Sequence, residues 1–204
     1  MNTDANGLRV DYAVISEWVG RGEKVLDLGC GDGTLLDHLQ RTRAITGYGI
    51  EINPQEVIRC IERGVNVIQA DLDAGLAQFE NLAFDCVIMA EALQVVLRPD
   101  RLLEEMLRVS QRSIVTFPNF GHWRCRLGLM LGGRMPISPS LPNQWYDTPN
   151  IHLCTVSDFE RLCQARGIRI ARRAVVDRHH RVTLGARLWP NMLGEIALYE
   201  LCRG

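Results

Sequence analysis

The sequence predicts an α/β fold in which helices alternate with the strands of a parallel sheet. Strand-like and helix-like hydrophobic patterns alternate over the first 117 of the 204 residues. A glycine-rich turn directly follows the first strand pattern, and an acidic residue lies at the end of three successive strands. Because the carboxyl ends of parallel strands meet at one edge of a sheet, these acids are expected to lie together there.

The first half of the chain contains five expected strands and four expected helices. The strands are placed at 23–28, 44–52, 65–69, 84–90 and 112–117. A helix opens the chain, a second follows the glycine turn, a third runs from Pro54 to a stop at Gly64, and a fourth runs from Pro99 to Val109. The residues expected to face inward from the first three helices are Val10, Val14, Ile15, Trp18 and Val19, then Leu35, Leu36 and Leu39, then Val57, Ile58 and Ile61.

The pattern breaks after the fifth strand. Five of the eight prolines lie between residues 118 and 150, together with Phe120, Trp123, Trp145 and Tyr146. This segment is too rich in proline for a regular element and too aromatic for a solvated linker, so we expect an ordered insertion or lid. A helix then ends near Gly167, and strands at 168–176 and 195–202 close the fold. The inward residues of that helix are expected to be Val156, Phe159, Leu162 and Cys163.

Composition excludes several classes of protein. With 47% apolar residues, 23% charged residues and a formal charge of -1, the chain is neither disordered nor attracted as a whole to nucleic acid or an anionic membrane. The seven cysteines include no C-x-x-C pair, which predicts buried thiols in a reducing compartment and no metal site. The beginning of the chain does not resemble a signal peptide, and the longest apolar run, at 127–133, is too short to span a bilayer. A cytoplasmic location is therefore expected.

The segment VLDLGCGDG at 25–33 is the strongest motif. Gly29, Gly31 and Gly33 allow a sharp turn and a close approach of the backbone to a ligand, with Cys30 between them. A dinucleotide site would place pyrophosphate here, but its glycine spacing differs and Asp27 would repel phosphate. An ammonium group beside Asp27 suits the methionine part of S-adenosylmethionine.

Further carboxylates extend this candidate cofactor site. Glu51 ends the second strand about twenty residues after the turn, where an acid can accept hydrogen bonds from ribose hydroxyls. Asp71 ends the third strand and is assigned to the adenine amino group, with Ile52 and Leu72 beside the ring. Glu91, after the fourth strand, is included in the set. The structural alternative is that Asp27 accepts hydrogen bonds within the turn while Glu51 and Asp71 cap helices.

Catalytic chemistry is not evident from the motifs. The segment MAEALQ at 89–94 supplies Glu91 and Gln94 but lacks an Asn-Pro-Pro-aromatic motif. His122, Asp147 and His152 flank the insertion and are candidates for a general base, with structural hydrogen bonding as the alternative for each. The aromatic residues of the insertion suit a lid core, an interface or a substrate cage.

A cationic segment lies near the end of the chain. Between 166 and 187 seven arginines and two histidines accompany a single acid, Asp177. A solvated strand face explains this excess best, a protein partner comes second, and nucleic acid comes last because the net charge is near zero.

The glycine and carboxylate pattern resembles that of class I S-adenosylmethionine-dependent methyltransferases. That resemblance implies a Rossmann-like, seven-stranded, mostly parallel sheet with an antiparallel last strand and helices on both faces. More specific strings resemble the MetW family of methionine biosynthesis proteins: GVNVIQADLD (64–73), FPNFGHWR (117–124), GRMP (133–136) and WYDTPNIHLCT (145–155). This second resemblance covers nearly the whole chain, and it implies a link to homoserine O-acyltransferase, whose activity members of the family are implicated in supporting.

Three hypotheses follow. The first is a regulatory protein that binds S-adenosylmethionine or S-adenosylhomocysteine and acts on homoserine O-acyltransferase; the second is a methyltransferase for an unidentified small molecule; the third is a purely structural role. All of them use one domain over 1–204, divided into a nucleoside-binding core (1–117), a lid or insertion (118–155) and a closing helix and strands (156–204). The oligomeric state and the docking surface stay open.

Overall fold

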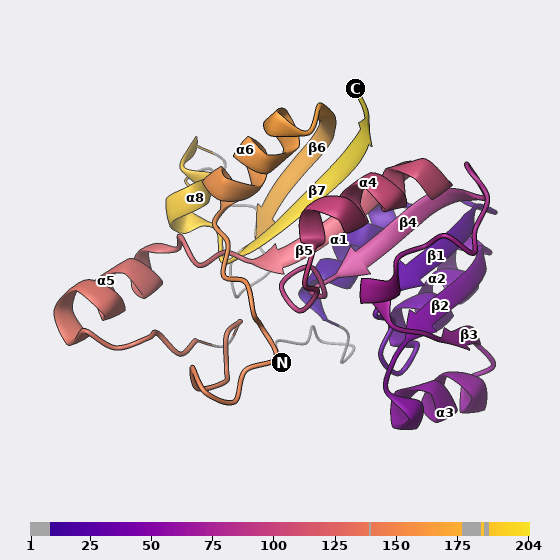
Figure 1. The fold of residues 1–204 in the computed structure, drawn as a ribbon, viewed down its shortest axis with the longest axis horizontal. Coiled ribbons are helices and arrows are strands. Elements are labelled where there is room, and N and C mark those ends of the chain that lie inside the picture. The colour runs from indigo at the N-terminus through magenta and orange to yellow at the C-terminus, as the bar shows by residue number, and fades with distance from the viewer. Residues whose placement is uncertain (1–8, 139, 177–184, 186–187) are drawn as a thin grey trace.

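One seven-stranded sheet runs through the protein in the computed structural model, which describes residues 9–138, 140–176, 185 and 188–204. The strand order is β3-β2-β1-β4-β5-β7-β6, and Figure 1 shows helices packed on both sides of the sheet. Strand β7 is antiparallel to both of its neighbours, whereas β1 to β5 pair in parallel. The expected Rossmann-like sheet with an antiparallel last strand is therefore confirmed. The strands are β1 (Lys24–Leu28), β2 (Thr46–Glu51), β3 (Asn66–Gln69), β4 (Phe84–Ala90), β5 (Ser110–Pro118), β6 (Ile168–Val176) and β7 (Ile196–Arg203).

The two faces of the sheet are covered by different helices. One face packs on α4 (Pro99–Val109) and α6 (Val156–Ala165), and the other packs on α1 (Val10–Trp18), α2 (Thr34–Arg43) and α3 (Pro54–Glu62). Each strand sends alternate side chains to opposite faces, so Leu26 joins the first core while Val25 joins the second. The remaining helical elements are η1 (Leu72–Ala74), α5 (Trp123–Gly132) and α8 (Pro190–Leu193).

Helix α6 shows how local sequence and packing act together. Thr155 and Asp158 form a reciprocal capping box at its first turn, which satisfies backbone N–H groups that have no partner within the helix. Its buried face carries Phe159, whose ring lies 4.9 Å from that of Phe117 and 4.7 Å from that of Tyr199. These three aromatic rings join α6 to the two adjacent strands β5 and β7.

Two details of the predicted fold are wrong. Ile58 and Ile61 were expected to face inward from α3, but they are 49% and 64% exposed, and the buried residue of this helix is Cys60. Apolar spacing alone could not distinguish the two faces, because Gly33 and Val65 accommodate a small thiol rather than an isoleucine. The insertion was expected to lack regular structure, yet residues 123–132 form α5, since all its prolines except Pro118 lie after the helix.

In the ranges that the structure describes, no helix combines the length and apolar character needed to cross a membrane.

Replacing Phe159 by Ala is expected to lower the free energy of unfolding by about 3–5 kcal/mol, because it opens a cavity between α6, β5 and β7. Ile61→Ala, on the exposed side of α3, is the matched control and should change it by no more than about 0.5 kcal/mol. Urea unfolding of both variants measures these changes. Equal decreases in the free energy of unfolding would show that the packing of α3 and α6 is misassigned.

Candidate functional site

The glycine turn between β1 and α2 is held against the end of β2. Gly29 and Cys30 both donate backbone hydrogen bonds to the carbonyl oxygen of Ile50, at 2.8 and 3.1 Å. Gly29 has a φ of +71°, and a Cβ there would lie 3.0 Å from the Cβ of Ala92. Glycine is required here because a side chain would be strained and would collide with the loop after β4.

A cavity of about 420 Å³ opens beside this turn, at the carboxyl edge of the sheet. Open α/β sheets bind their ligands at this edge. Four of the predicted cofactor residues line the cavity: Asp27, Gly29, Cys30 and Gly31. The other lining residues are Arg9, Tyr12, Asp32, Thr34, Glu56, Arg59 and Ala90.

Asp27 is the most unusual residue of the cavity. Its side chain is buried at the end of β1, and its Oδ1 has no hydrogen-bond partner among the described residues. The pKa of Asp27 is raised to about 7, chiefly by burial and in smaller part by the charges of Asp11 and Glu51, while the charge of Arg9 opposes the rise. A buried acceptor without a partner costs free energy, so a cationic donor entering the cavity would relieve that cost.

Arg9 is one of two arginines that line the cavity, and its charge acts on Asp27. Its guanidinium lies 2.6 Å from the carboxylate of Asp11, 3.2 Å from that of Glu91, and 4.9 Å from the centre of the Tyr12 ring. Asp11 is buried and also accepts a hydrogen bond from the hydroxyl of Thr116 at 3.1 Å. This network brings the predicted residue Glu91 next to the cavity and fixes the start of α1 over it.

Glu51 organises the second side of the turn. One carboxylate oxygen accepts the N–H of Gly31 at 2.9 Å, and the other accepts the N–H groups of Ile52 and Asn53 at 2.9 and 2.8 Å. Glu51 does not cap α3, whose N-cap is Asn53; its side chain instead joins the turn to the segment before that helix. Its first oxygen accepts only one described hydrogen bond, and a carboxylate oxygen has room for a second.

The remaining predicted cofactor residues lie around the cavity rather than in its lining. Asp71 is exposed and caps η1 by accepting the N–H of Asp73 at 2.9 Å, and Ile52 is 59% exposed. Leu72 approaches the turn, because its Cδ1 is 4.0 Å from where a Cβ of Gly29 would lie. Gly33 adopts a left-handed conformation and serves as the N-cap of α2.

Sequence reasoning missed the contribution of α1. Arg9 and Tyr12 line the cavity, but the opening helix was assessed only for its apolar face. The signal that could have found them is the pair Arg9 and Asp11, two opposite charges at the start of an apolar helix. Asp32 was also missed; its carboxylate accepts hydrogen bonds from Thr34 and pairs with Arg63 at 2.7 Å, contacts that favour a pKa below the usual range although burial opposes them.

The three candidates for a general base lie outside the lining of the glycine-turn cavity. His122 is buried at the N-cap of α5, and burial lowers its pKa. Asp147 is exposed, and the ring of His152 lies 3.3 Å from the carbonyl oxygen of Leu97. A backbone contact of that kind agrees with the structural alternative for His152.

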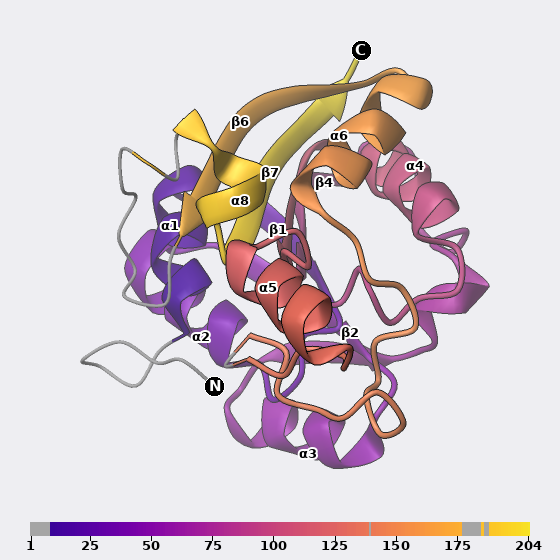
Figure 2. The ribbon, with the colours of Figure 1, turned by 90° about the vertical axis from the view of Figure 1, so that its left-hand side faces the viewer.

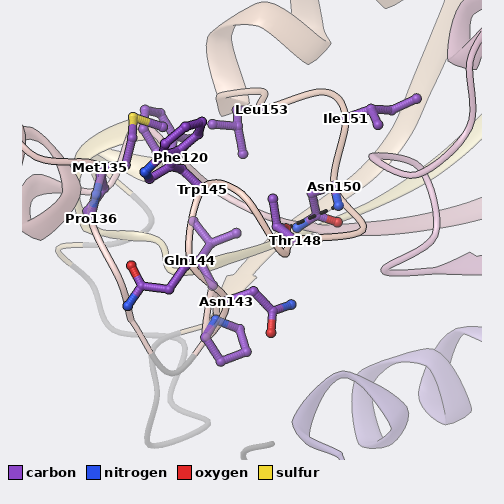
Figure 3. A pocket seen from close by; sticks show the side chains of 12 residues that line it. Phe120, Met135, Pro136, Asn143, Gln144, Trp145, Thr148, Asn150, Ile151 and Leu153 are labelled. Carbon is purple, nitrogen blue, oxygen red and sulfur yellow. Dashed lines mark hydrogen bonds between the residues drawn. The ribbon is translucent and has the colours of Figure 1, made fainter.

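A second, smaller cavity of about 150 Å³ lies within the insertion, and Figure 3 shows the side chains around it. None of the described residues that line it is charged. Its wall combines apolar side chains with the amide and hydroxyl groups of four residues, so it suits an uncharged group. The lining consists of Phe120, Met135, Pro136, Leu141, Pro142, Asn143, Gln144, Trp145, Thr148, Asn150, Ile151 and Leu153.

The cationic segment is partly neutralised by acids from other elements. Arg172 pairs with Glu200 at 3.0 Å, and Arg173 pairs with Glu160 at 2.8 Å. These contacts fit the interpretation as a strand face. Asp177, both histidines of the segment and the arginines at 178, 181 and 187 lie outside the described residues.

The described residues contain no group of three metal-ligating side chains, and all seven cysteines are free thiols, five of them buried.

Comparison with known protein families gives a match along nearly the whole chain. The family model described as methionine biosynthesis protein MetW matches residues 9–201. The bifunctional methionine biosynthesis protein MetXA/MetW of Rhodopirellula baltica is 36% identical over 164 residues, which is 76% of this chain and 26% of the relative. A ubiquinone biosynthesis O-methyltransferase of Pseudomonas fluorescens is 37% identical over 111 residues, 52% of this chain and 47% of that protein. This chain therefore spans about a quarter and about half of the lengths of these curated relatives.

Solved structures show the same fold at low sequence identity. An S-adenosylmethionine-dependent methyltransferase from Mesorhizobium loti has a TM-score of 0.71 and 16% identity, covering 96% of this chain and 98% of its own. A possible histamine N-methyltransferase from Thermotoga maritima has a TM-score of 0.66 and 14% identity, covering 96% and 88%. These similarities confirm the expected methyltransferase fold.

Asp27→Asn is expected to change how stability depends on pH. The folded pKa of Asp27, about 7, lies above its unfolded value, so the folded state retains a proton that the unfolded state loses as pH rises. Wild-type stability should therefore fall relative to the variant between about pH 4 and pH 7, by at most about 1.4 kcal/mol per pH unit. Urea unfolding at pH 4.5, 6 and 8 without added ligand measures the difference. A difference that is constant with pH would contradict the burial of an ionisable Asp27.

Proposed function

The chain belongs to the MetW family, and from this membership we propose that it binds S-adenosylmethionine or S-adenosylhomocysteine and supports or regulates a homoserine O-acyltransferase. The observation that supports this ligand is Asp27, a buried carboxylate beside a cavity of about 420 Å³ whose Oδ1 has no hydrogen-bond partner among the described residues. Both ligands carry an ammonium group, which supplies the missing donor.

The charges of the cavity suit the two ends of an amino acid. Asp27 is proposed to accept the ammonium group, and Arg9 is proposed to pair with the carboxylate. The glycines at 29, 31 and 33 and Cys30 leave space for close contact with an uncharged chain. S-adenosylmethionine, when bound, supplies an activated methyl group on its sulfonium, whereas S-adenosylhomocysteine supplies none.

The nucleoside is assigned to the ends of β2 and β3. The oxygen of Glu51 that accepts only the Gly31 N–H is proposed to accept a ribose hydroxyl as well. Asp71 is proposed to accept the adenine amino group, with Ile52 and Leu72 as apolar neighbours. The 59% exposure of Ile52 supports this assignment, because an apolar side chain at that edge is open for a ring to cover. Glu91 is proposed to hold the guanidinium of Arg9, which it contacts, in position for the carboxylate of the ligand.

The partnership is supported by the bifunctional relative, whose name joins MetXA and MetW in one polypeptide. Fusion keeps two activities at a high effective concentration, which benefits proteins that bind each other. If the ligand changes the affinity for the partner, the partner must change the affinity for the ligand by the same factor. We place this function in the cytoplasm, because seven free thiols suit a reducing compartment.

The second candidate function is methyl transfer to an unidentified small molecule. It is favoured by the similarity to ubiquinone biosynthesis O-methyltransferases and by the uncharged cavity of the insertion. His122, with its pKa lowered by burial, would be neutral near pH 7 and able to accept a proton, and Asp147 and His152 are the other candidates. Radiolabelled S-adenosylmethionine incubated with a cell extract tests this function; the transfer of label to no acceptor would count against it.

Asp27→Asn and Glu51→Gln are each expected to weaken binding of S-adenosylhomocysteine by about tenfold or more, because each removes a charged acceptor worth about 1.5–3 kcal/mol. Glu104→Gln, at an exposed side chain on the outer side of α4, is the matched control and should leave the Kd unchanged. Isothermal titration calorimetry measures all three variants. Unchanged affinity in both site variants would place the ligand elsewhere.

Purified homoserine O-acyltransferase is expected to turn over faster or to remain active longer when this protein is added. S-adenosylmethionine should alter that effect for the wild type, and Asp27→Asn should remove the dependence on it. Initial rates and thermal inactivation rates, measured with and without the ligand, provide the comparison. An acyltransferase that behaves identically with and without this protein, and forms no complex with it, would contradict the partnership.

A further inference from the structure

Helix α5 leaves apolar side chains uncovered along almost its whole length. Its one buried residue is Cys125, whereas Met130 is 72% exposed and Leu131 is 79% exposed. Figure 1 shows the helix projecting away from the sheet. Helices in proteins are stabilised mainly by packing an apolar face, so an apolar helix that packs so little is built for a contact outside the chain.

We call the exposed apolar residues of this helix and of the turn after it the α5 surface. Large exposed apolar areas on soluble proteins mark interaction sites. Two further exposed aromatic side chains, Trp145 and Tyr146, belong to the same insertion. The α5 surface consists of Trp123, Leu127, Leu129, Met130, Leu131 and Met135.

The base of α5 is fixed to the rest of the protein. Arg126 donates a hydrogen bond to the carbonyl oxygen of Gly121 at 2.6 Å across the first turn of the helix. Just before it, the side chain of Asn119 donates to the carbonyl oxygens of Asn191 and Gly194, at 3.1 and 2.8 Å. Figure 2 shows α5 beside α8, to which these contacts join it. The surface is therefore presented in a defined position, which lowers the entropy cost of binding.

The segment that contains the α5 surface, residues 119–146, has a positive net charge. Residues 119–146 include Arg124, Arg126 and Arg134 and no acidic residue, and Arg124 lies over the ring of Trp123 at 5.4 Å. A symmetric dimer through this surface would bring the arginines of two copies together without an acid from either segment. Charge complementarity therefore favours a different protein, one that presents an apolar patch with acidic side chains at its rim.

We propose that the α5 surface is where this protein docks onto homoserine O-acyltransferase, at an apolar patch of that enzyme rimmed by acidic residues. The inference rests on the partnership proposed above, which the bifunctional relative supports. None of the residues of the α5 surface lines the cavity at the glycine turn. The partner and the small ligand therefore bind at separate sites and at the same time, which regulation by the ligand requires.

Leu131→Glu and Met130→Glu test the surface directly. Each places a negative charge where the partner is apolar with an acidic rim, so the Kd for purified homoserine O-acyltransferase should rise by about tenfold or more. Ile61→Glu is the matched control, since it adds the same charge at a side chain of α3 that is 64% exposed, and it should change the Kd by about twofold at most. All three substituted residues are exposed, and circular dichroism together with titration of S-adenosylhomocysteine verifies that each variant is folded.

Arg134→Glu separates charge from apolar contact. It should slow association and weaken the salt dependence of binding, because rim charges act mainly on the association rate. Surface plasmon resonance at two ionic strengths measures both quantities.

The possible outcomes are distinguishable. A wild-type protein that fails to bind the acyltransferase overturns the partnership and this inference with it. If the wild type binds the acyltransferase and Leu131→Glu, Met130→Glu and Ile61→Glu all bind it equally well, the docking surface alone is overturned. If light scattering shows that the wild type is a dimer and that Leu131→Glu is a monomer, the surface binds a second copy of this chain instead, and the docking proposal is overturned. If the wild type sediments with anionic phosphatidylserine vesicles and Leu131→Glu does not, the surface binds a membrane instead, and the docking proposal is overturned.

Discussion

The burial of Asp27 without a complete set of partners is the constraint around which the site is arranged. A carboxylate at the end of a central strand carries a large desolvation cost, which Arg9 offsets only in part. The protein places Arg9 there by folding α1 over the edge of the sheet, and it holds that arginine with Asp11 and Glu91. A site whose charges are incompletely balanced without a ligand is predisposed to bind one that balances them.

The glycine turn determines the geometry of the site around Asp27. Backbone N–H groups of the turn donate hydrogen bonds to the carbonyl oxygen of Ile50 and to the side chain of Glu51, and these bonds hold the turn against the end of β2. The same bonds show that Glu51 shapes the turn while one of its oxygens retains the capacity to accept a further hydrogen bond. Structural and functional interpretations of this residue are therefore compatible rather than exclusive.

The insertion separates two kinds of interaction. Its loop encloses a small uncharged cavity, whereas its helix presents apolar side chains outward beside arginines. Residues 9–117, by comparison, gather opposite charges around one cavity. The ligand proposed above would bind at the edge of the sheet and the proposed partner on α5, so neither contact would block the other.

The sequence by itself determined the fold and the main motif of the site. Alternation of strands and helices, the spacing of Gly29, Gly31 and Gly33, and acids at strand ends all follow from local patterns, and local patterns are visible in a chain. Only the tertiary structure decided that Ile58 and Ile61 face outward, that Arg9 pairs with Glu91, and that the apolar side chains of α5 are exposed. Those features depend on which surfaces distant segments bury, and helical periodicity defines a face without specifying what, if anything, packs against it.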